Sequence, residues 1–222
     1  MLTHIQLPPL PQILLVDDSP VNLDLLNHHL RDREYTCVTA ASGTRAWEIL
    51  EQEPDRFYAV VLDRMMPEMD GMEVLLRMKQ HPVLNQIPVI MQTAAGTQQQ
   101  ILEGLQAGAY YYLTKPFERE TLLAIVAAAV RDRLAQLELL KQLEQQRDTL
   151  TMLRYGEFQF RTLAEAKRLT ALLSSVCPQP EKVAMGLSEL LINAVEHGNL
   201  GITYKEKTKL IQDNAWEGEL NQ

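Results

Sequence analysis

The sequence has little cysteine and no long apolar run. Its two cysteines, Cys37 and Cys177, cannot form a disulfide framework, which favours a reducing compartment. The longest uninterrupted apolar run, residues 122–130, is too short to cross a bilayer. The first residues carry no basic flank before a continuous apolar stretch, so they do not form a secretory signal. We therefore expect a cytoplasmic protein without a membrane segment.

Positive charge is also scarce. Lys and Arg number 21 against 29 Asp and Glu, which gives a net charge of −8. A nucleic-acid-binding surface needs a local excess of Lys and Arg, so we expect no direct nucleic-acid binding. The composition, 46% hydrophobic and 23% charged, is typical of a soluble globular protein and excludes a wholly disordered or collagen-like chain.

Short apolar runs alternate with segments of helical spacing in the first half of the chain. The runs are rich in β-branched residues and lie at 13–16, 37–40, 58–62, 89–92 and 111–114. The segments with helical spacing lie at 21–30, 45–50, 72–78 and 98–107, and a fifth begins at Glu118. Five strands that alternate with five helices predict an α/β fold with a doubly wound, five-stranded parallel sheet covered on both faces.

Glycine and proline are absent between Glu118 and Tyr155. The segment is rich in Leu, Ala, Glu, Gln and Arg, which are good helix formers, so it predicts one long C-terminal helix that continues past the compact domain. Leucines at intervals of three, four and seven in its distal half predict a short, imperfect coiled coil and a homodimer. Packing of this helix on its own chain is the alternative.

A second, smaller domain is predicted after a glycine that ends the long helix. The alternation of Phe158 and Phe160 with polar residues predicts a short strand. Thr162 and Glu165 form a capping-box pattern, which predicts the start of a helix. Two prolines separate this helix from a further helical pattern at 181–197. Together these signals predict a small, incomplete α+β domain.

Polar residues follow four of the predicted strands. Asp17 and Asp18 follow the first strand, Asp63 the third, Thr93 the fourth and Lys115 the fifth. Open parallel sheets bind their ligands at this carboxyl edge. A single Asp after a strand is common, but converging carboxylates repel one another unless a cation such as Mg2+ is present. An Asp carboxylate can also be the nucleophile in phosphoryl transfer, with Lys neutralising charge on the transferred group.

The stretches ILLVDDSPVN, VVLDRMMPEMDGMEVL, VIMQTAAG and YYLTKPF resemble the response-regulator receiver domain over about residues 11–130. The resemblance implies a flavodoxin-like receiver that accepts a phosphoryl group from a sensor histidine kinase in a two-component phosphorelay. By this resemblance, Asp63 is the phosphoacceptor, and Thr93 and Lys115 contact the phosphoryl group. Tyr112 matches the switch aromatic, whose rotamer changes on phosphorylation.

The same resemblance implies a magnesium site. Asp18, Asp63 and the backbone carbonyl of Met65 ligate Mg2+ directly in this interpretation, and Asp17 acts through water. The peptide bond before Pro116 is expected to be cis, as in the family. A degenerate receiver that takes no phosphate is the alternative, although the key positions are kept.

Glu189 and Asn193 lie four residues apart, so they share one face of a predicted helix. The surrounding string ELLINAVEHGNLGI resembles the first ATP-binding box of the Bergerat-type (GHKL) ATPases, in particular the anti-sigma-factor serine kinases. The resemblance covers about residues 156–222. It implies that Asn193 chelates the Mg2+ of ATP and that Glu189 is the candidate catalytic base. A solvated helix face is the alternative, because a Glu–Asn pair alone is a weak signal.

The remaining parts of that ATPase pattern are missing from the sequence. The family's later Asp-x-Gly-x-Gly segment and its Gly-rich lid have no counterpart after residue 156. We therefore interpret the sequence as a fragment of a longer protein and expect no ATP turnover from it. In the longer protein, the resemblance implies ATP-Mg2+ binding and a serine kinase that acts on an anti-sigma-antagonist type partner.

The predicted order is a tail at 1–10, a receiver domain at 11–130, a helical, coiled-coil-like linker at 131–155 and the N-terminal part of a GHKL-type ATPase domain at 156–222. The leading hypothesis is a response regulator whose receiver controls a kinase-like output module. The alternative is a non-enzymatic docking protein whose dimerisation is controlled by phosphorylation, with a degenerate ATPase segment. A flavodoxin-like cofactor binder is disfavoured, because an acidic pocket without a metal repels the phosphate of FMN.

Overall fold

The chain forms two compact units, Met1–Leu139 and Leu140–Gln222. The computed structural model describes residues 10–31, 35–94 and 98–199. Most of the predicted tail and residues 200–222 of the predicted ATPase segment lie outside the described residues. The boundary between the units falls inside the predicted linker, and each unit has an apolar core of its own.

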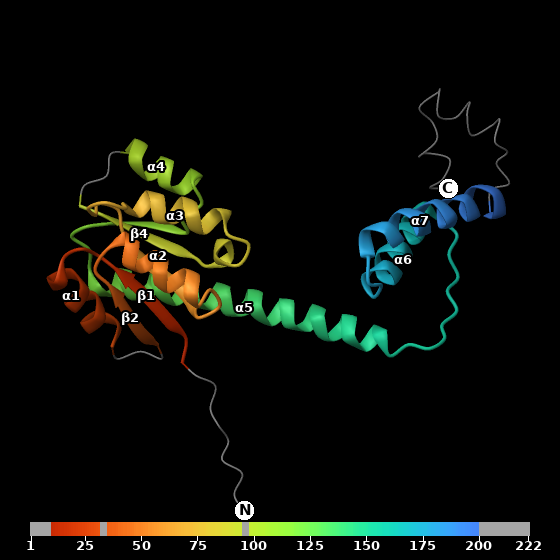
Figure 1. Cartoon of the computed structure of the whole chain (residues 1–222), viewed down its shortest axis with the longest axis horizontal. Helices are drawn as coiled ribbons and strands as arrows, with labels where there is room; N and C mark the ends of the chain where they lie inside the picture. The colour runs from red at the N-terminus through yellow and green to blue at the C-terminus, as the bar shows by residue number, and fades with distance from the viewer. Residues whose placement is uncertain (1–9, 32–34, 95–97, 200–222) are drawn as a thin grey trace, which may run out of the picture. The chain divides into compact units, whose positions relative to one another are not determined.

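The first unit is built on a sheet of five parallel strands, in the order β2-β1-β3-β4-β5 (Figure 1). All five strand predictions are confirmed, and each end lies within one residue of its predicted place. The strands are β1 (Gln12–Val16), β2 (Thr36–Ala40), β3 (Phe57–Asp63), β4 (Val89–Thr93) and β5 (Tyr111–Thr114). The strand order reverses between β1 and β3, so their carboxyl ends lie side by side, with Val16 opposite Leu62.

Helices cover both faces of the sheet, as the alternating pattern predicts. On one face, α1 (Pro20–Leu30) and α5 (Arg119–Thr151) bury leucines and valines against Ile13, Leu15 and Ile90. On the other, α2 (Gly43–Gln52) and α3 (Gly71–Gln80) pack on a separate apolar cluster, which Ile101 of α4 (Gln98–Gln106) also joins. A short 3-10 helix, η1 (Leu84–Gln86), precedes β4.

Glycine is required where α3 begins. Asp70 caps α3 by accepting a hydrogen bond from the backbone N–H of Glu73, at 2.8 Å. A Cβ atom on Gly71 would lie 2.1 Å from the backbone oxygen of Asp63, which is closer than any side-chain carbon can approach. The Asp-Gly pair of the sequence therefore lets the first turn of α3 pack directly against the end of β3.

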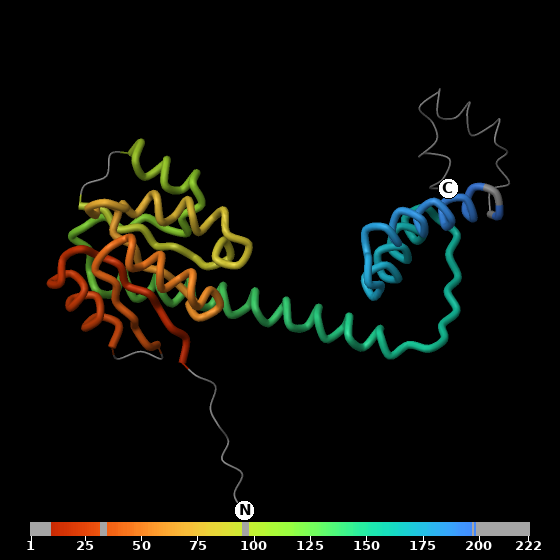
Figure 2. Tube along the Cα trace, viewed as in Figure 1, coloured from red at the N-terminus to blue at the C-terminus, as the bar shows by residue number. Residues whose placement is uncertain are grey.

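The long helix α5 is continuous from Arg119 to Thr151 (Figure 2). It ends four residues earlier than predicted. In its last two turns, the hydroxyls of Thr149 and Thr151 donate to the carbonyls of Gln145 and Asp148, and such side-chain bonds compete with helix propagation. One face of its first half is buried in the core, whereas Leu139 and Leu143 in the second half are 57% and 54% exposed. The coiled coil therefore remains a prediction.

After α5, the described residues of the second unit form α6 (Leu163–Ser175), α7 (Pro180–Asn193) and a π-helical segment η2 (Ala194–Asn199), and an irregular segment at 152–162 precedes α6. The capping box is present, because Thr162 and Glu165 each accept a backbone hydrogen bond from the other residue. The strand predicted at Phe158 and Phe160 is wrong, since this segment pairs with no other strand in the described part of the chain. Helices are thus the only regular secondary structure in the described part of the predicted α+β unit.

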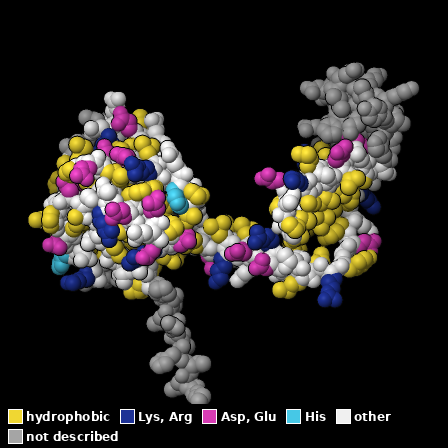
Figure 3. All heavy atoms as spheres, in the orientation of Figure 1, with side chains coloured by type: hydrophobic (Ala, Val, Ile, Leu, Met, Phe, Trp, Pro, Cys, Tyr) yellow, Lys and Arg dark blue, Asp and Glu magenta, His cyan; other side chains and the backbone are white. Residues whose placement is uncertain are grey.

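The helices of the second unit leave apolar surface uncovered. Met185 and Leu190 on α7 are 77% and 66% exposed, and no residue of α7 is fully buried. Figure 3 shows hydrophobic side chains gathered on the visible face of this unit. No described helix in either unit is long and apolar enough to span a bilayer.

Candidate functional site

The carboxyl edge of the sheet brings together four of the predicted site residues. Asp17 follows β1, Asp63 ends β3, Thr93 ends β4 and Lys115 follows β5. The side chains of Asp17, Asp63 and Thr93 are almost completely buried. The backbone N–H of Lys115 donates to the carbonyl of Thr93 at 2.7 Å, which extends the β4–β5 pairing to the site. The predicted convergence at this edge is therefore present.

Lys115 lies between two carboxylates. Its Nζ donates to Oδ2 of Asp17 at 2.7 Å and to Oδ1 of Asp63 at 2.5 Å. The Lys115–Pro116 peptide bond is cis, as the resemblance implies. One ammonium group thus neutralises only part of the charge of two buried acids, and the site keeps an excess of negative charge.

Asp17 is held by its neighbours in the chain. Its Oδ1 accepts hydrogen bonds from the backbone N–H of Ser19 at 2.9 Å and from Nδ2 of Asn22 at 3.0 Å. The role of Asn22 was not predicted, although it ends the quoted stretch ILLVDDSPVN. The signal was available: Ser19 and Pro20 begin a helix, which places Asn22 in its first turn above the strand end.

Asp63 is fixed by the turn that follows β3. Its Oδ2 accepts the backbone N–H of Met65 at 2.8 Å, while the Met65 side chain is 69% exposed. Asp18, predicted as a direct metal ligand, is exposed beside Asp17. In the described part of the chain, no three His, Cys, Asp or Glu side chains are grouped closely enough to form a metal site by themselves.

The electrostatics of the site follow from burial. Burial raises the pKa of Asp63, and the Asp17 charge adds to this, while the hydrogen bonds from Lys115 and Met65 oppose it. Burial alone lowers the pKa of Lys115, but its hydrogen bonds to Asp17 and Asp63 outweigh that effect and raise it. The two acids thus favour a charged Lys115, whereas the ionised form of Asp63 is disfavoured.

This asymmetry predicts a pH-dependent stability. Because the pKa of Asp63 is higher in the folded state than its ordinary value of about 3.9, folding stability falls as pH rises from that value through the raised pKa. We expect Asp63→Asn to raise the Tm at pH 7 without divalent metal, because it removes a buried charge that the folded state disfavours. The gain should shrink as the pH falls, because protonation of the wild-type carboxyl removes the same buried charge.

Thermal unfolding at pH 7 and at a lower pH measures this difference. Glu48→Gln is a suitable control, because Glu48 is exposed and forms only a surface ion pair with Arg45. An equal gain for Asp63→Asn at both pH values contradicts the electrostatic explanation.

Comparison with known proteins identifies the first unit. The sequence pattern of the family described as "Response regulator receiver domain" matches residues 13–127, about half of the chain. The chain belongs to this receiver family. Its first unit is thus a response-regulator receiver domain, with the flavodoxin-like fold that the resemblance implies.

The curated relatives extend well beyond the matched region. The chain is 38% identical over 130 residues to the "DNA-binding dual master transcriptional regulator RpaA" of Synechocystis, covering 57% of this chain and 53% of that protein. It is 34% identical over 128 residues to the "Transcriptional regulatory protein SrrA" of Staphylococcus aureus, covering 57% and 51%. The chain spans about half the length of these relatives. The expected lack of nucleic-acid binding therefore remains a prediction.

Solved receiver structures share the fold. The signal receiver domain of an HD domain-containing protein from Pseudomonas fluorescens matches with a TM-score of 0.54 and 28% identity, over 62% of this chain and 98% of that chain. The CheX–CheY complex with BeF3 and Mg2+ from Borrelia burgdorferi matches with a TM-score of 0.50 and 28% identity, over 53% and 87%.

Tyr112, the residue that the resemblance implies as the switch aromatic, is buried. Tyr112 on β5 is 8% exposed, and its hydroxyl accepts a hydrogen bond from Nη1 of Arg64 at 2.5 Å. Its ring lies against Gly104 of α4, where an added Cβ would be 2.1 Å from Cε2 of Tyr112. Arg64 was not singled out from the sequence. An Arg directly after the phosphoacceptor candidate was the available signal.

The ATPase candidates lie outside the receiver. Glu189 and Asn193 are both on α7, four residues apart, as predicted. Glu189 is exposed and Asn193 is half-buried. Their placement on one helix agrees with the predicted spacing, and their roles remain predictions.

Proposed function

We propose that Asp63 accepts a phosphoryl group from a sensor histidine kinase and that this modification switches the receiver between two states. The observation that carries the proposal is the contact of Asp63 Oδ1 with Lys115 Nζ at 2.5 Å, at the edge where β1 and β3 meet. In the transfer, a carboxylate oxygen forms a bond to phosphorus while the bond from phosphorus to the phosphohistidine nitrogen breaks. The released imidazole takes up a proton, and an acyl phosphate remains on the receiver.

Mg2+ is the proposed cofactor. The donor types suit a hard divalent cation: the carboxylates of Asp18 and Asp63 and the backbone carbonyl of Met65 would be its direct oxygen ligands, and Asp17 would act through water. Asp18 is exposed, so water could complete the coordination. The excess negative charge beside Lys115 supports the same conclusion. Bound Mg2+ neutralises charge on the transferred phosphoryl group. The Borrelia burgdorferi complex that contains BeF3 and Mg2+ further supports this proposal.

Lys115 and Thr93 are the proposed phosphoryl contacts. Lys115 already lies against Asp63, so its ammonium is in place to pair with a phosphoryl oxygen. Thr93 ends the neighbouring strand β4, and its hydroxyl can donate to another oxygen. We propose that these contacts change the arrangement of β5 and α4, with Tyr112 as the switch side chain.

The test uses acetyl phosphate with Mg2+ as the phosphodonor. We expect the wild-type protein to gain the mass of one phosphoryl group and to lose it on alkaline treatment, as an acyl phosphate does.

An apolar surface of the receiver beside Asp63 is the proposed docking site of the kinase. A pocket of about 420 Å3 lies next to Lys115, between α1 and the start of α5. It is lined by Asn22, Leu25, Leu26, Gln92, Ala94, Lys115, Pro116 and Phe117. On α1, Val21 is 74% and Leu25 is 47% exposed. An apolar patch at this position supports contact with a partner that must deliver a phosphoryl group to Asp63.

Dimerisation through α5 is part of the proposed function. The exposed Leu139, Leu140 and Leu143 are unpaired apolar side chains on the distal half of the helix, residues 131–151. A helix stripe of this kind is stabilised by a second copy packed in coiled-coil fashion. The proposed role of this linker is to connect a cytoplasmic receiver domain at 11–130 to the module at 156–222.

For that module we propose the start of a GHKL-type ATPase with serine kinase activity in a longer chain. The capping box at Thr162, the helix break before Pro180 and the spacing of Glu189 and Asn193 support it. Asn193 would hold ATP-Mg2+, Glu189 would act as base, and an anti-sigma-antagonist type protein would receive the phosphoryl group. The alternative is a docking module without catalysis. The uncovered apolar face of α7 supports this alternative as well as it supports an ATPase.

Phosphate release from Mg-ATP distinguishes an ATPase module from a docking module. We expect this chain to release no phosphate from Mg-ATP, and we expect release only from a longer product that also carries the family's later nucleotide-contact segments. Asn193→Ala in that product should abolish the release, since it removes the proposed metal ligand. Ser188→Ala, on the same helix, is the control. A full-length product that binds protein partners but releases no phosphate supports the docking module instead.

A further inference from the structure

Arg64 occupies a position between the phosphoacceptor and the switch face. It directly follows Asp63, and its backbone is fixed on both sides. Its N–H donates to the carbonyl of Gln92 on β4 at 2.9 Å, and its carbonyl accepts the N–H of Gly71 at the start of α3 at 2.9 Å. A change in the position of Asp63 is therefore passed to Arg64 through one peptide unit.

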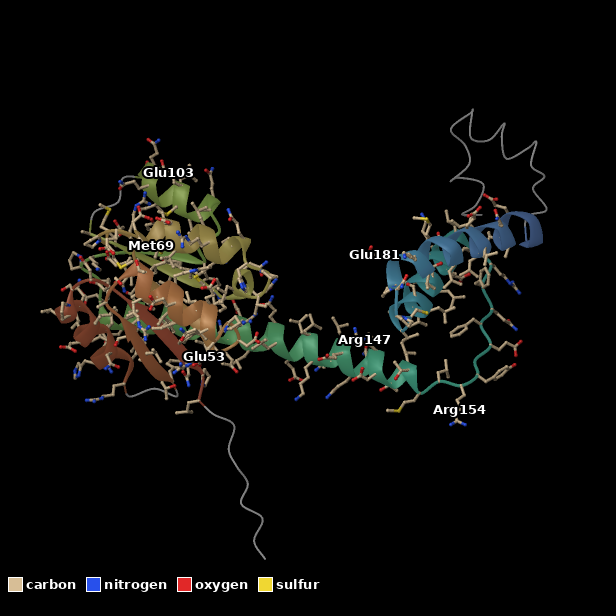
Figure 4. The ribbon with its side chains drawn as sticks, in the orientation of Figure 1. Glu53, Met69, Glu103, Arg147, Arg154 and Glu181 are labelled. Carbon is tan, nitrogen blue, oxygen red and sulfur yellow. The ribbon has the colours of Figure 1, made fainter. Side chains whose placement is uncertain are left out.

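The Arg64 side chain contacts β5 and α4. Its guanidinium is largely buried, with 13% of the side chain exposed. Nη1 donates to the hydroxyl of Tyr112 at 2.5 Å and to the backbone carbonyl of Gln100 at 3.1 Å. Nη2 lies 3.6 Å from Oε2 of Glu103, which projects from α4 (Figure 4). One cation thus joins β5 to two successive turns of α4.

The Tyr112 ring depends on the same contact. The ring fills the space above Gly104, where a Cβ would lie 2.1 Å away, so α4 and Tyr112 are closely packed. Apart from Arg64, the partners in this group are a phenol, a carbonyl and one half-exposed carboxylate. Because the charge of Arg64 is only partly balanced, additional negative charge on Asp63 changes the balance of forces on the guanidinium.

We propose that Arg64 is a positioning residue that couples the phosphorylation state of Asp63 to Tyr112 and α4. The inference rests on the proposed function, in which Asp63 is the acceptor. Both sites contact or adjoin one side chain, so a change at either alters the free energy of the other. In the described state, Arg64 contacts both Tyr112 and α4. Phosphorylation changes the strength of these contacts.

Amide hydrogen exchange of α4 with and without Mg2+ and beryllium fluoride tests the coupling. In the wild type, we expect the phosphoryl analogue to change the exchange rates of α4 amides by about five-fold or more, the lower end of allosteric couplings. Arg64→Ala should lose most of this change while still binding beryllium fluoride, followed by fluorine NMR. Tyr112→Phe removes only the hydroxyl that accepts the hydrogen bond from Arg64, and it should lose a similar part of the α4 response. The double variant should lose no more than either single variant, because both break one interaction.

The control is Arg77→Ala. Arg77 lies on α3, pairs with Glu73 at 2.7 Å and stacks over Trp47. This variant should keep the wild-type response of α4. An Arg64→Ala protein that binds the analogue and keeps the full response overturns the proposal, as does a full response in Tyr112→Phe if Arg64→Ala fails to fold. A wild type that binds no beryllium fluoride instead contradicts the assignment of Asp63 as acceptor.

Discussion

Asp63→Asn is expected to abolish phosphorylation by acetyl phosphate and Mg2+. An amide oxygen is a far weaker nucleophile than a carboxylate oxygen, and Asn also removes one of the charges that attract the metal. The fold should persist, because Asn is of similar size and can keep the hydrogen bond from the N–H of Met65 to its side-chain oxygen. Intact-protein mass spectrometry after a fixed incubation gives the fraction that carries one phosphoryl group.

Asp70→Asn is the matched control for this experiment. It makes the same chemical change in the same loop, and Asn caps a helix about as well as Asp does. Asp70 accepts the N–H of Glu73 and is exposed, so its replacement should leave labelling unchanged. If Asp63→Asn and the wild type are labelled equally, the acceptor is another residue and the proposed function is wrong.

Lys115→Met is expected to destabilise the receiver and to make its stability depend on Mg2+. The substitution leaves the buried carboxylates of Asp17 and Asp63 without their shared cation. Removing one partner from a buried ion pair costs about 3–5 kcal/mol, and we expect roughly 3 because Lys115 is partly exposed. Millimolar Mg2+ should restore more stability in this variant than in the wild type, where Lys115 competes for the same oxygen atoms.

Urea unfolding with EDTA and with Mg2+ measures both effects. Lys141→Met, on the exposed part of α5, is the control and should change neither the stability nor its dependence on metal. If Mg2+ stabilises the Lys115→Met variant no more than the wild type, the metal does not share the oxygens of Asp17 and Asp63. That result contradicts the proposed ligand set and leaves the family membership intact.

The sheet and its carboxyl edge were predictable because their signals are local. A buried parallel strand is a short apolar run, and Asp17, Asp63, Thr93 and Lys115 lie at or directly after the ends of such runs. Parallel pairing then brings these ends together without further information. The capping box at Thr162 was predictable for the same reason, since both of its residues are neighbours in the sequence.

The remaining features depend on contacts between distant parts of the chain. The partners of Arg64 lie 36 to 48 residues away on α4 and β5, so no local pattern reveals them. The alternation at Phe158 and Phe160 resembles a strand, but a strand needs a neighbour to pair with, and the described residues provide none. The early end of α5 depends on the hydroxyls of Thr149 and Thr151, whose competition with the backbone is too weak to predict with confidence from propensity alone.

The ion pairs of Lys115 have a consequence for biosynthesis. Lys115 is 98 residues from Asp17 and 52 residues from Asp63 in the sequence. During translation, the two acids therefore leave the ribosome well before the lysine that joins them, and contacts of such large sequence separation form late in folding. Under the proposed function, a nascent chain that ends before β5 lacks Lys115 and cannot be phosphorylated efficiently on Asp63. The receiver therefore becomes functional only when β5 has paired with β4.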